Sequence, residues 1–307
     1  MPFQPPDATV VEHLIQQMPP FPKTRKARER RIAYDPQGRV QELNLSRLRL
    51  MQVPAELGQL SRLHRLDLSR NHLTQLPAEL GQLAALSWLD LSNNLLVQLP
   101  TALGRLSQLK RLDLSHNQLT QLPGELGQLN TLEQLILSHN QLQIPAELGQ
   151  LSQLELLSLD WNQLTKVPAE LGQLGTLRVL FLSNNKLTRL PAELSQLTRL
   201  EWLDLGYNQL TQLPAELGRL KELRVLHLSH NHLTQLPAEL GQLSRLERLS
   251  LYFNRLTQIP VELGQLEALQ ELHVSYNPEL QIPPPAVVAQ GSTQAILAYL
   301  RSLHEQE

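Results

Sequence analysis

Ten asparagines recur along the chain at regular spacing, each among leucines, and their amides are the most regular chemical groups in the sequence. The spacing is 23 residues except for one interval of 22, between Asn140 and Asn162. The full series is Asn71, Asn94, Asn117, Asn140, Asn162, Asn185, Asn208, Asn231, Asn254 and Asn277. Because an amide offers both an acceptor and donors, such a series can bind a ligand or satisfy buried backbone groups.

Sequence patterns typical of catalysis are absent. The chain contains no GxxxxGK[ST], GxGxxG, HExxH or GxSxG pattern, so we assign no catalytic residue. His116 and His139 would lie on neighbouring repeats near Asp90 and Asp113, but no third ligand completes a metal site, and solvated surface histidines are the favoured interpretation. We therefore expect a chain that is not an enzyme and that holds no metal or cofactor of its own.

Composition predicts a soluble cytoplasmic protein. The 307 residues are 41% hydrophobic, which is enough for a sizeable core. Cysteine is absent, which excludes disulfides and thiolate sites and favours an intracellular location. No run approaches the roughly 18 apolar residues of a membrane span, and the N-terminus lacks a signal-peptide pattern, so we expect no membrane association.

Charge is distributed unevenly between the first 39 residues and the rest. Residues 1–39 hold seven Lys and Arg against four Asp and Glu, whereas the remainder holds 20 against 25. The basic run from Lys23 to Arg31 could bind an acidic partner, but a solvated helix face or linker is the favoured interpretation. The run is too short to indicate a nucleic-acid interface, so we expect no nucleic-acid partner.

The elements that position these side chains follow from the 23-residue period. The unit LxxLxLxxNxLtqLPaeLgqL is present eleven times when it is projected back to Val40, where Leu48 replaces the Asn. Leu66 and Leu68 point the same way from a short strand, and leucines of the turns return to the same interior. One coil cannot bury its own leucines, so coils must stack. The sequence predicts an α/β, right-handed solenoid of about eleven repeats, a horseshoe with a parallel sheet on the concave face and short helical turns on the convex face.

The turn segments carry helix start and stop signals. In each PAEL segment the proline suits the first helical position, and the glutamate meets the positive end of the turn. Gly81 and its equivalents are then expected to end the turn.

Both ends of the array are expected to carry helical caps. Residues 8–18 place apolar residues on one helical face, and residues 292–307 place Ser292 as N-cap before the apolar Ile296, Leu297, Tyr299 and Leu300. We therefore divide the chain into an N-terminal helical cap with the basic segment (1–39), the solenoid (40–283) and a C-terminal capping or linker helix (284–307).

The asparagines are predicted to form a structural ladder. Where each strand ends the chain turns inward, and the buried backbone groups there have no partner in the sheet. Stacked Asn side chains can satisfy these groups from one coil to the next. Loss of one member is expected to cost about 1–3 kcal/mol.

Sequence variation is concentrated at strand positions that face the concave side, and all eight aromatic residues within the repeats lie there. Aromatics with variable polar neighbours on a sheet are typical of protein-binding surfaces, although some of them could simply cover their neighbours. The densest part is predicted between Leu156 and Val225. In the N-terminal half, Asp67, Asp90 and Asp113 with Arg65 and Arg111 are predicted to form a self-satisfied ionic lattice. The predicted protein-binding residues are Trp88, Leu156, Trp161, Val179, Phe181, Trp202, Tyr207, Val225, Tyr252, Phe253 and Tyr276.

The repeat is the leucine-rich-repeat pattern, and the segment after it is more specific. IPPPAVVAQGSTQAILAYLRSL (282–303) resembles the junction that follows the repeats in bacterial Roco proteins, where a GTPase domain (Roc) and a dimerisation domain (COR) come next. This chain ends at Glu307, before any phosphate loop. The resemblance implies a fragment of a larger GTPase whose parent binds GTP and Mg²⁺. It also implies that the repeats contact the Roc–COR portion or a second protomer and modulate the GTPase cycle.

A different class of function is a bacterial leucine-rich-repeat effector or stand-alone scaffold that binds another protein. An effector of this kind is expected to carry a secretion signal and a catalytic Cys. The absence of Cys and the Roco-like exit segment both weigh against that interpretation.

Overall fold

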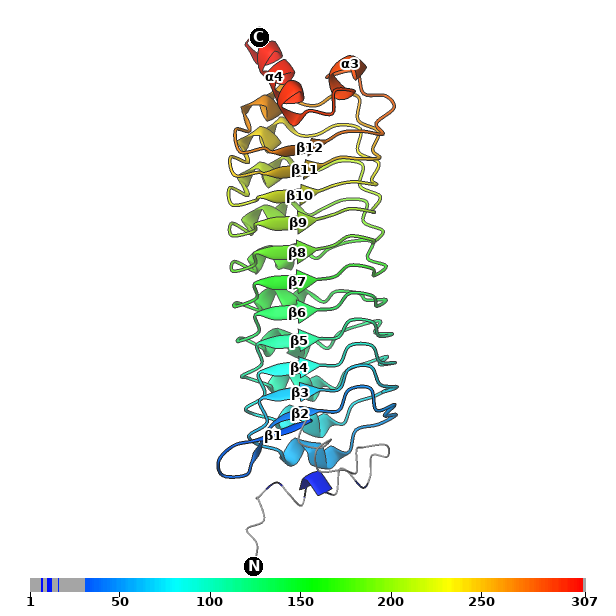
Figure 1. Ribbon diagram of the computed structural model, residues 1–307, viewed down its shortest axis with the longest axis vertical. Coiled ribbons are helices and arrows are strands. Elements are labelled where there is room, and N and C mark those ends of the chain that lie inside the picture. Colours follow the sequence, from blue (N-terminus) through cyan, green and yellow to red (C-terminus); the bar gives the residue numbers. More distant parts are fainter. Residues whose placement is uncertain (1–6, 8–9, 13–15, 17–30, 306–307) are drawn as a thin grey trace, which may run out of the picture. The chain divides into compact units, whose positions relative to one another are not determined.

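The computed structural model describes Asp7, residues 10–12, Gln16 and residues 31–305. The chain divides into two compact units, Met1–Leu154 and Glu155–Glu307, called here the N-terminal and C-terminal units. Within each unit, one short strand and one short helical turn repeat from coil to coil (Figure 1).

The N-terminal unit is built on six strands. Five of them are parallel and paired in register, with residues 23 positions apart opposite each other, such as Leu43 and Leu66. The remaining strand, β1, is antiparallel to β2 and places Ile32 opposite Leu43. The strands are β1 (Ile32–Tyr34), β2 (Val40–Asn44), β3 (Arg65–Asp67), β4 (Trp88–Asp90), β5 (Arg111–Asp113) and β6 (Gln134–Ile136).

Strand β1 lies within residues 1–39, where a helical cap and a basic segment were expected. It lies outside the 23-residue repeat, so the period that predicts the other strands does not predict this one. Of the predicted helix over residues 8–18, Val10–Glu12 is helical and Val11 is buried. The other residues of that segment, except Gln16, and residues 23–30 of the basic run lie outside the described residues.

The C-terminal unit contains six further strands, all parallel and in register. They are β7 (Leu156–Ser158), β8 (Val179–Phe181), β9 (Trp202–Asp204), β10 (Val225–His227), β11 (Arg248–Ser250) and β12 (Glu271–His273). Helices α3 (Pro285–Val288) and α4 (Thr293–His304) follow. The expected N-cap is confirmed, because the Ser292 hydroxyl accepts a hydrogen bond from the Ala295 N–H. Helix α4 packs against the last turn and buries Ile296, Leu297 and Leu300.

Each coil returns through a five-residue 3₁₀ helix. The turns are η1 (Ala55–Gln59), η2 (Ala78–Gln82), η3 (Thr101–Arg105), η4 (Gly124–Gln128), η5 (Ala146–Gln150), η6 (Ala169–Gln173), η7 (Ala192–Gln196), η8 (Ala215–Arg219), η9 (Ala238–Gln242) and η10 (Val261–Gln265). The proline precedes the helix as its N-cap, with extended backbone such as φ −70° and ψ 144° at Pro77, so its expected place at the first helical position is wrong by one residue. Glu79 and most of its equivalents lie in the first turn, as expected.

The expected role of the turn glycines is also wrong. Gly81 is the fourth residue of η2 and does not end it, and its backbone is not left-handed. A Cβ added at Gly81 would collide with the backbone carbonyl of Ala102 in the next turn. Glycine is therefore needed for close stacking of successive turns. Ser195 holds this position in η7.

Leucine fills the interior of both units. Leu66, Leu68 and Leu83 are fully buried in one coil, and their equivalents are buried in the others. The predicted repeat solenoid is confirmed. The opposite side of the sheet is called here the strand face. It carries the first and third residues of β3 to β12, Glu42 and Asn44 of β2, and the two residues before each ladder Asn and before Leu48. Within the described part of the chain, no helix is both long enough and apolar enough to cross a membrane.

Candidate functional site

The asparagine ladder, the ten residues from Asn71 to Asn277 named above, lies inside the coils. The side-chain N–H groups of Asn117 donate to the carbonyls of Leu91 and Leu114, both at 3.0 Å, and its Oδ1 accepts from the Leu96 N–H at 3.0 Å. Within a unit, an amide of this kind therefore joins its own coil to the preceding one. The ten asparagines are only 3–9% exposed, so they offer no surface to a ligand.

The residue before each Asn has left-handed backbone, which the sequence did not indicate. In these ten residues, from Arg70 to Tyr276, and in Arg47, which precedes Leu48, φ lies between 51° and 60°. Asn adopts this conformation more readily than aromatic residues do, and Asn93 and Asn184 follow that preference. Trp161, Tyr207 and their aromatic equivalents do not, so the chain accepts some backbone strain to present rings there.

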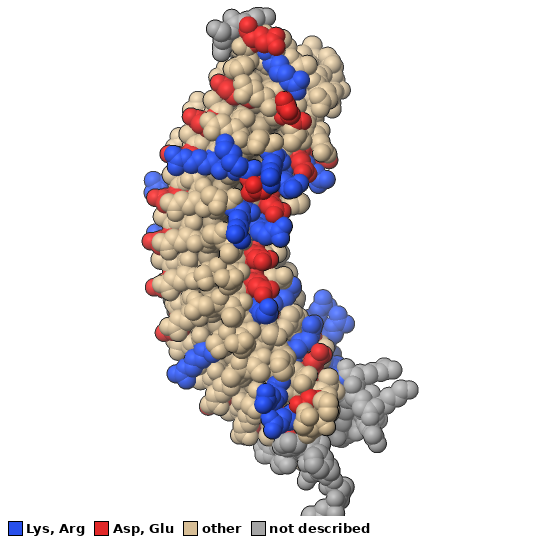
Figure 2. All heavy atoms as spheres, turned by 90° about the vertical axis from the view of Figure 1, so that its left-hand side faces the viewer, with Lys and Arg blue, Asp and Glu red and all other residues tan. Residues whose placement is uncertain are grey.

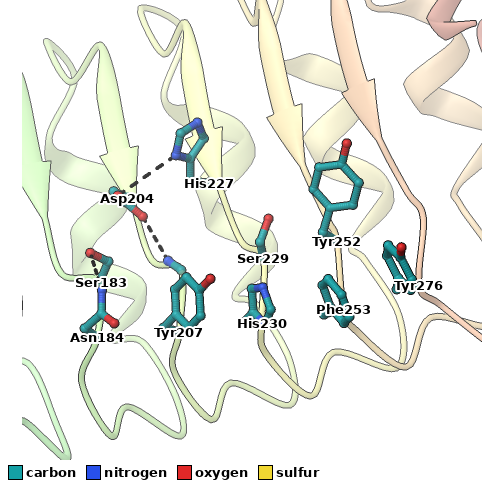
Figure 3. A pocket seen from close by; sticks show the side chains of 11 residues that line it. Ser183, Asn184, Asp204, Tyr207, His227, Ser229, His230, Tyr252, Phe253 and Tyr276 are labelled. Atoms are coloured by element: carbon teal, nitrogen blue, oxygen red, sulfur yellow. Dashed lines mark hydrogen bonds and ion pairs between the residues drawn. The ribbon is translucent and has the colours of Figure 1, made fainter. Parts of the chain in front are cut away.

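Four of these rings form a continuous aromatic stack in the C-terminal unit, as Figure 3 shows for Tyr207, His230, Phe253 and Tyr276. Successive ring centroids lie 4.1, 4.4 and 4.2 Å apart. The spacing follows from the separation of neighbouring parallel strands, about 4.8 Å. Because the rings cover each other's faces, the stack presents mainly ring edges to solvent, while Tyr207 and Tyr276 remain 54% and 67% exposed.

A second set of aromatic contacts runs along the strands themselves. Trp202 packs edge-on against Phe181 and against His227 on the neighbouring strands. Tyr252 stacks on His273, and its hydroxyl lies 3.1 Å from His273 Nδ1. The strand face of the C-terminal unit therefore carries aromatic groups along its strands and along the left-handed positions beside them.

The predicted protein-binding residues differ in accessibility. Trp161, Tyr207, Phe253 and Tyr276 are exposed, and the half-buried set is Trp88, Leu156, Val179, Phe181, Trp202 and Tyr252. Val225 is 6% exposed between the longer side chains of Trp202 and Arg248 on the neighbouring strands, so including it as a contact residue was wrong. Trp88 lies in the N-terminal unit, where the Arg65 guanidinium stacks 3.7 Å over its ring.

An open groove of about 620 Å³ lies on the strand face of the C-terminal unit (Figure 3). It overlaps the segment from Leu156 to Val225, where the sequence placed the densest patch, from Ser183 onward, and extends beyond it to Tyr276. The sequence reasoning missed Asp204, His227 and His230, although variation in the same columns could have indicated them. The groove is lined by Ser183, Asn184, Asp204, Gly206, Tyr207, His227, Ser229, His230, Tyr252, Phe253 and Tyr276.

Two aspartates on the strand face, Asp90 and Asp160, have a raised pKa. Burial is the main cause that raises the pKa of Asp160, and the charge of Asp204 adds to the rise. Hydrogen bonds from Ser183 and Ser158 oppose it. Burial likewise raises the pKa of Asp90 in the N-terminal unit. Both carboxylates are held by serines of the scaffold, which is not an arrangement for acid–base catalysis.

The histidine pair in the N-terminal unit is an aromatic contact. The rings of His116 and His139 stack with centroids 4.1 Å apart and an interplanar angle of 12°. Across the described residues, no group of three or more His, Cys, Asp or Glu side chains is placed to hold a metal ion.

Exposed ion pairs connect neighbouring coils beside the strands, and Figure 2 shows acidic and basic side chains next to each other on this side of the molecule. Lys110 pairs with Glu133 at 2.8 Å and Arg224 with Glu247 at 2.6 Å. The expected ionic lattice is present in part, since Arg111 lies 3.7 Å from Asp113 while Arg65 stacks on Trp88. Exposed pairs of this kind contribute about 0–1 kcal/mol each.

Comparison with known proteins identifies similar repeat proteins. Residues 39–168 and 168–306 match the family described as a leucine-rich repeat region. A leucine-rich-repeat protein from Leptospira interrogans is 38% identical with a TM-score of 0.70, over 79% of this chain and 71% of that one. No curated protein matches the chain by sequence.

Two receptors are also similar. A TDR receptor is 30% identical with a TM-score of 0.69, over 78% of this chain and 46% of that one. The ectodomain of the plant receptor kinase GASSHO1/SCHENGEN3 from Arabidopsis thaliana, in complex with CASPARIAN STRIP INTEGRITY FACTOR 2, is 29% identical with a TM-score of 0.69. That similarity covers 89% of this chain and 43% of the ectodomain. The chain therefore spans less than half of either receptor.

Proposed function

Because the chain belongs to the leucine-rich-repeat family, we propose that it is a non-catalytic protein-interaction module that binds its partner through the strand face of the C-terminal unit. The observation that carries the proposal is the set of exposed rings at Tyr207, Phe253 and Tyr276, which line an open groove. Trp161 is a further exposed ring of the same unit. Exposed aromatic residues at the centre of a shaped surface are typical of binding hot spots.

The arrangement of constant and variable residues supports the same surface. The 3₁₀ turns repeat nearly the same sequence in every coil, whereas the strand face changes residue type from coil to coil. The similar plant ectodomain in complex with a second protein factor is consistent with recognition by such repeats. A partner that recognises the residues that differ between coils therefore contacts the strand face.

The more specific part of the proposal is that this module comes from a bacterial Roco GTPase in the cytoplasm. The exit segment 282–303, which includes α3 and most of α4, supports this parentage by its resemblance to the Roco junction. The partner would then be the Roc–COR portion of the same protein or a second protomer. GTP and Mg²⁺ would bind in the parent's Roc domain, and we assign no residue of this chain to them.

A stand-alone scaffold or effector that binds another protein is the second candidate. The similarity to the leucine-rich-repeat protein from Leptospira interrogans supports it, because that similarity covers 71% of the other chain. In both candidates the binding surface is the same, and only the partner differs.

The binding surface is tested with a triple variant, Tyr207→Ala, Phe253→Ala and Tyr276→Ala, in affinity capture from a lysate of the source organism. We expect the variant to lose at least about tenfold in affinity for the partner retained by wild type, since exposed hot-spot aromatics contribute that much. The matched control replaces Glu170, Glu193 and Glu239 on the 3₁₀ turns with Ala and should bind as wild type does. Equal capture by the strand-face variant would refute the proposed surface.

The parentage is tested by the coding sequence downstream of Glu307. A Roco parent requires a strand followed by GxxxxGK[ST]. A stop codon or an unrelated domain in that place would support the scaffold instead.

A further inference from the structure

Asp204 lacks a hydrogen-bond partner that its equivalents have. In the N-terminal unit, Asp113 holds the same strand position and accepts from both the backbone N–H of Ser115, at 3.1 Å, and its hydroxyl, at 2.7 Å. Asp204 accepts from the backbone N–H of Gly206, at 3.0 Å, and no hydroxyl is present because Gly206 replaces the serine. Its second oxygen, Oδ2, lies 4.0 Å from His227 Nδ1, beyond hydrogen-bond distance. One side of this carboxylate is therefore available to a donor.

The fold does not require glycine at position 206. The backbone there is not left-handed, so other residues adopt it without strain. A Cβ added to Gly206 would meet Asp204 Oδ1 at 3.3 Å and the Ser229 carbonyl at 3.5 Å, which are tight but tolerable contacts. Glycine therefore leaves open space beside the carboxylate that the serine of other coils would fill.

The aromatic stack ends beside the same space. One face of Tyr207 is covered by His230 at 4.1 Å, but on its other side the equivalent position holds Asn184. Ser183, Asn184, Asp204, Gly206 and Tyr207 all line the groove, and Figure 3 shows Asp204 above the gap between Asn184 and Tyr207. We call these five residues the Asp204 subsite. It combines a carboxylate, an amide and an exposed aromatic ring.

The charge of the strand face differs between the two units. In the N-terminal unit these positions hold four arginines (Arg47, Arg65, Arg70, Arg111) and four acids (Glu42, Asp67, Asp90, Asp113), a balance of 4 − 4 = 0. In the C-terminal unit they hold one arginine (Arg248) and three acids (Asp160, Asp204, Glu271), a balance of 1 − 3 = −2. Arg248 lies 3.6 Å from Glu271, which leaves Asp160 and Asp204 without a lysine or arginine among the strand-face positions of that unit.

We propose that the Asp204 subsite binds the guanidinium group of an arginine side chain supplied by the protein partner. A guanidinium is planar, so it can pack against the exposed ring of Tyr207 while it donates paired N–H groups to the Asp204 carboxylate. The Oδ1 of Asn184 offers a further acceptor. A lysine ammonium carries the same charge, but it is not planar and lacks the paired N–H donors of a guanidinium. This inference rests on the proposed function and names the chemistry of its partner.

The subsite is tested on the full chain by NMR titration with N-acetyl-arginine amide as the probe. We expect saturable shifts of the Gly206 and Tyr207 amide signals. N-acetyl-lysine amide should bind at least about threefold more weakly because it cannot stack or donate in pairs. N-acetyl-citrulline amide, which keeps the shape but has no charge, should give no saturable shift.

Three variants test which residues contribute to binding of the arginine probe. Asp204→Asn should weaken arginine binding at least about fivefold. Gly206→Ser restores the serine of other coils, so it should keep the fold and still weaken binding by a similar factor. Asp113→Asn is the matched control in the N-terminal unit and should leave the titration unchanged. Unchanged affinity in Asp204→Asn or Gly206→Ser, or equal binding of the citrulline probe, would overturn the subsite.

The two proposals fail in different ways. If Asp204→Asn binds the captured partner as wild type does while the triple strand-face variant has lost it, the arginine subsite is overturned and the proposed function stands. If the triple variant retains the partner, the proposed function fails, and the inference that rests on it fails too.

Discussion

Each ladder asparagine satisfies backbone groups of two coils with one side chain. The first coil has no ladder asparagine, and its Leu48 and Leu50 N–H groups both donate to Asn71 Oδ1 of the next coil, at 3.0 Å. Leu48 itself is buried. Asparagine thus serves the coil before it as well as its own, which is why a hydrophobic residue can replace it in the first coil.

Replacement of Asn117 by Ala is expected to lower the free energy of unfolding by about 1–3 kcal/mol. The substitution leaves the carbonyls of Leu91 and Leu114 and the Leu96 N–H without their side-chain partner in a buried site. Urea denaturation followed by circular dichroism measures the loss. Gln118→Ala, at an exposed neighbour, is the control and should change stability by less than about 0.5 kcal/mol. A loss no larger than that of the control would contradict the role of the ladder.

Aromatic residues at the left-handed positions are destabilised by backbone strain and stabilised by contacts between rings. Left-handed backbone costs about 1–2 kcal/mol for residues with a Cβ. Contact between two rings returns about 0.5–1.5 kcal/mol. The aromatic stack from Tyr207 to Tyr276 has three such contacts, so its strain is offset locally. Rings are therefore tolerated at these positions most easily in adjacent coils.

At the scale of the elements, the 3₁₀ turn sets how closely coils approach on the side away from the strands. Hydrogen bonds fix the strand spacing, and the turns must pack at a distance that matches it. In η2 the close contact falls at Gly81, against the carbonyl of Ala102. The glycine is a packing residue between elements, which a single turn considered alone would not reveal.

Gly81→Ala is expected to destabilise the chain by about 1–3 kcal/mol through overpacking between η2 and η3. Gly175→Ala is the matched control, because a Cβ at Gly175 meets nothing within 4 Å. Thermal unfolding of the two variants compares the positions directly. If both variants unfold at the same temperature as the wild type, the neighbouring turn must move to accommodate the added Cβ. The chain already accommodates a side chain at this position in η7, where Ser195 stands.

At the scale of the whole molecule, stability arises from contacts between successive coils. Within each unit, strands pair with the strands of adjacent coils, and ladder bonds join a coil to the one before it. The two compact units follow from this local pattern, because each contains its own leucine interior and its own strand pairs. Stability in such arrays is approximately a sum of nearest-neighbour contributions.

Loss of one ladder asparagine is therefore expected to destabilise only the neighbouring coils. In Asn117→Ala, hydrogen exchange followed by mass spectrometry should show faster exchange in β4, β5 and β6 and unchanged exchange in β10, β11 and β12. Uniformly faster exchange over residues 31–305 would instead show that the array unfolds as one cooperative unit.

The sequence alone determined the period, the parallel strands, the leucine interior and the chemistry of the ladder. It could do so because each of these depends on contacts that repeat every 23 residues, so one repeat predicts the next. Tertiary structure decided what does not repeat: that β1 adds an antiparallel strand, that Val225 is buried, and that Gly206 leaves Asp204 open beside Tyr207. Those features depend on which side chains meet between coils, and spacing along the chain does not specify how much room they leave.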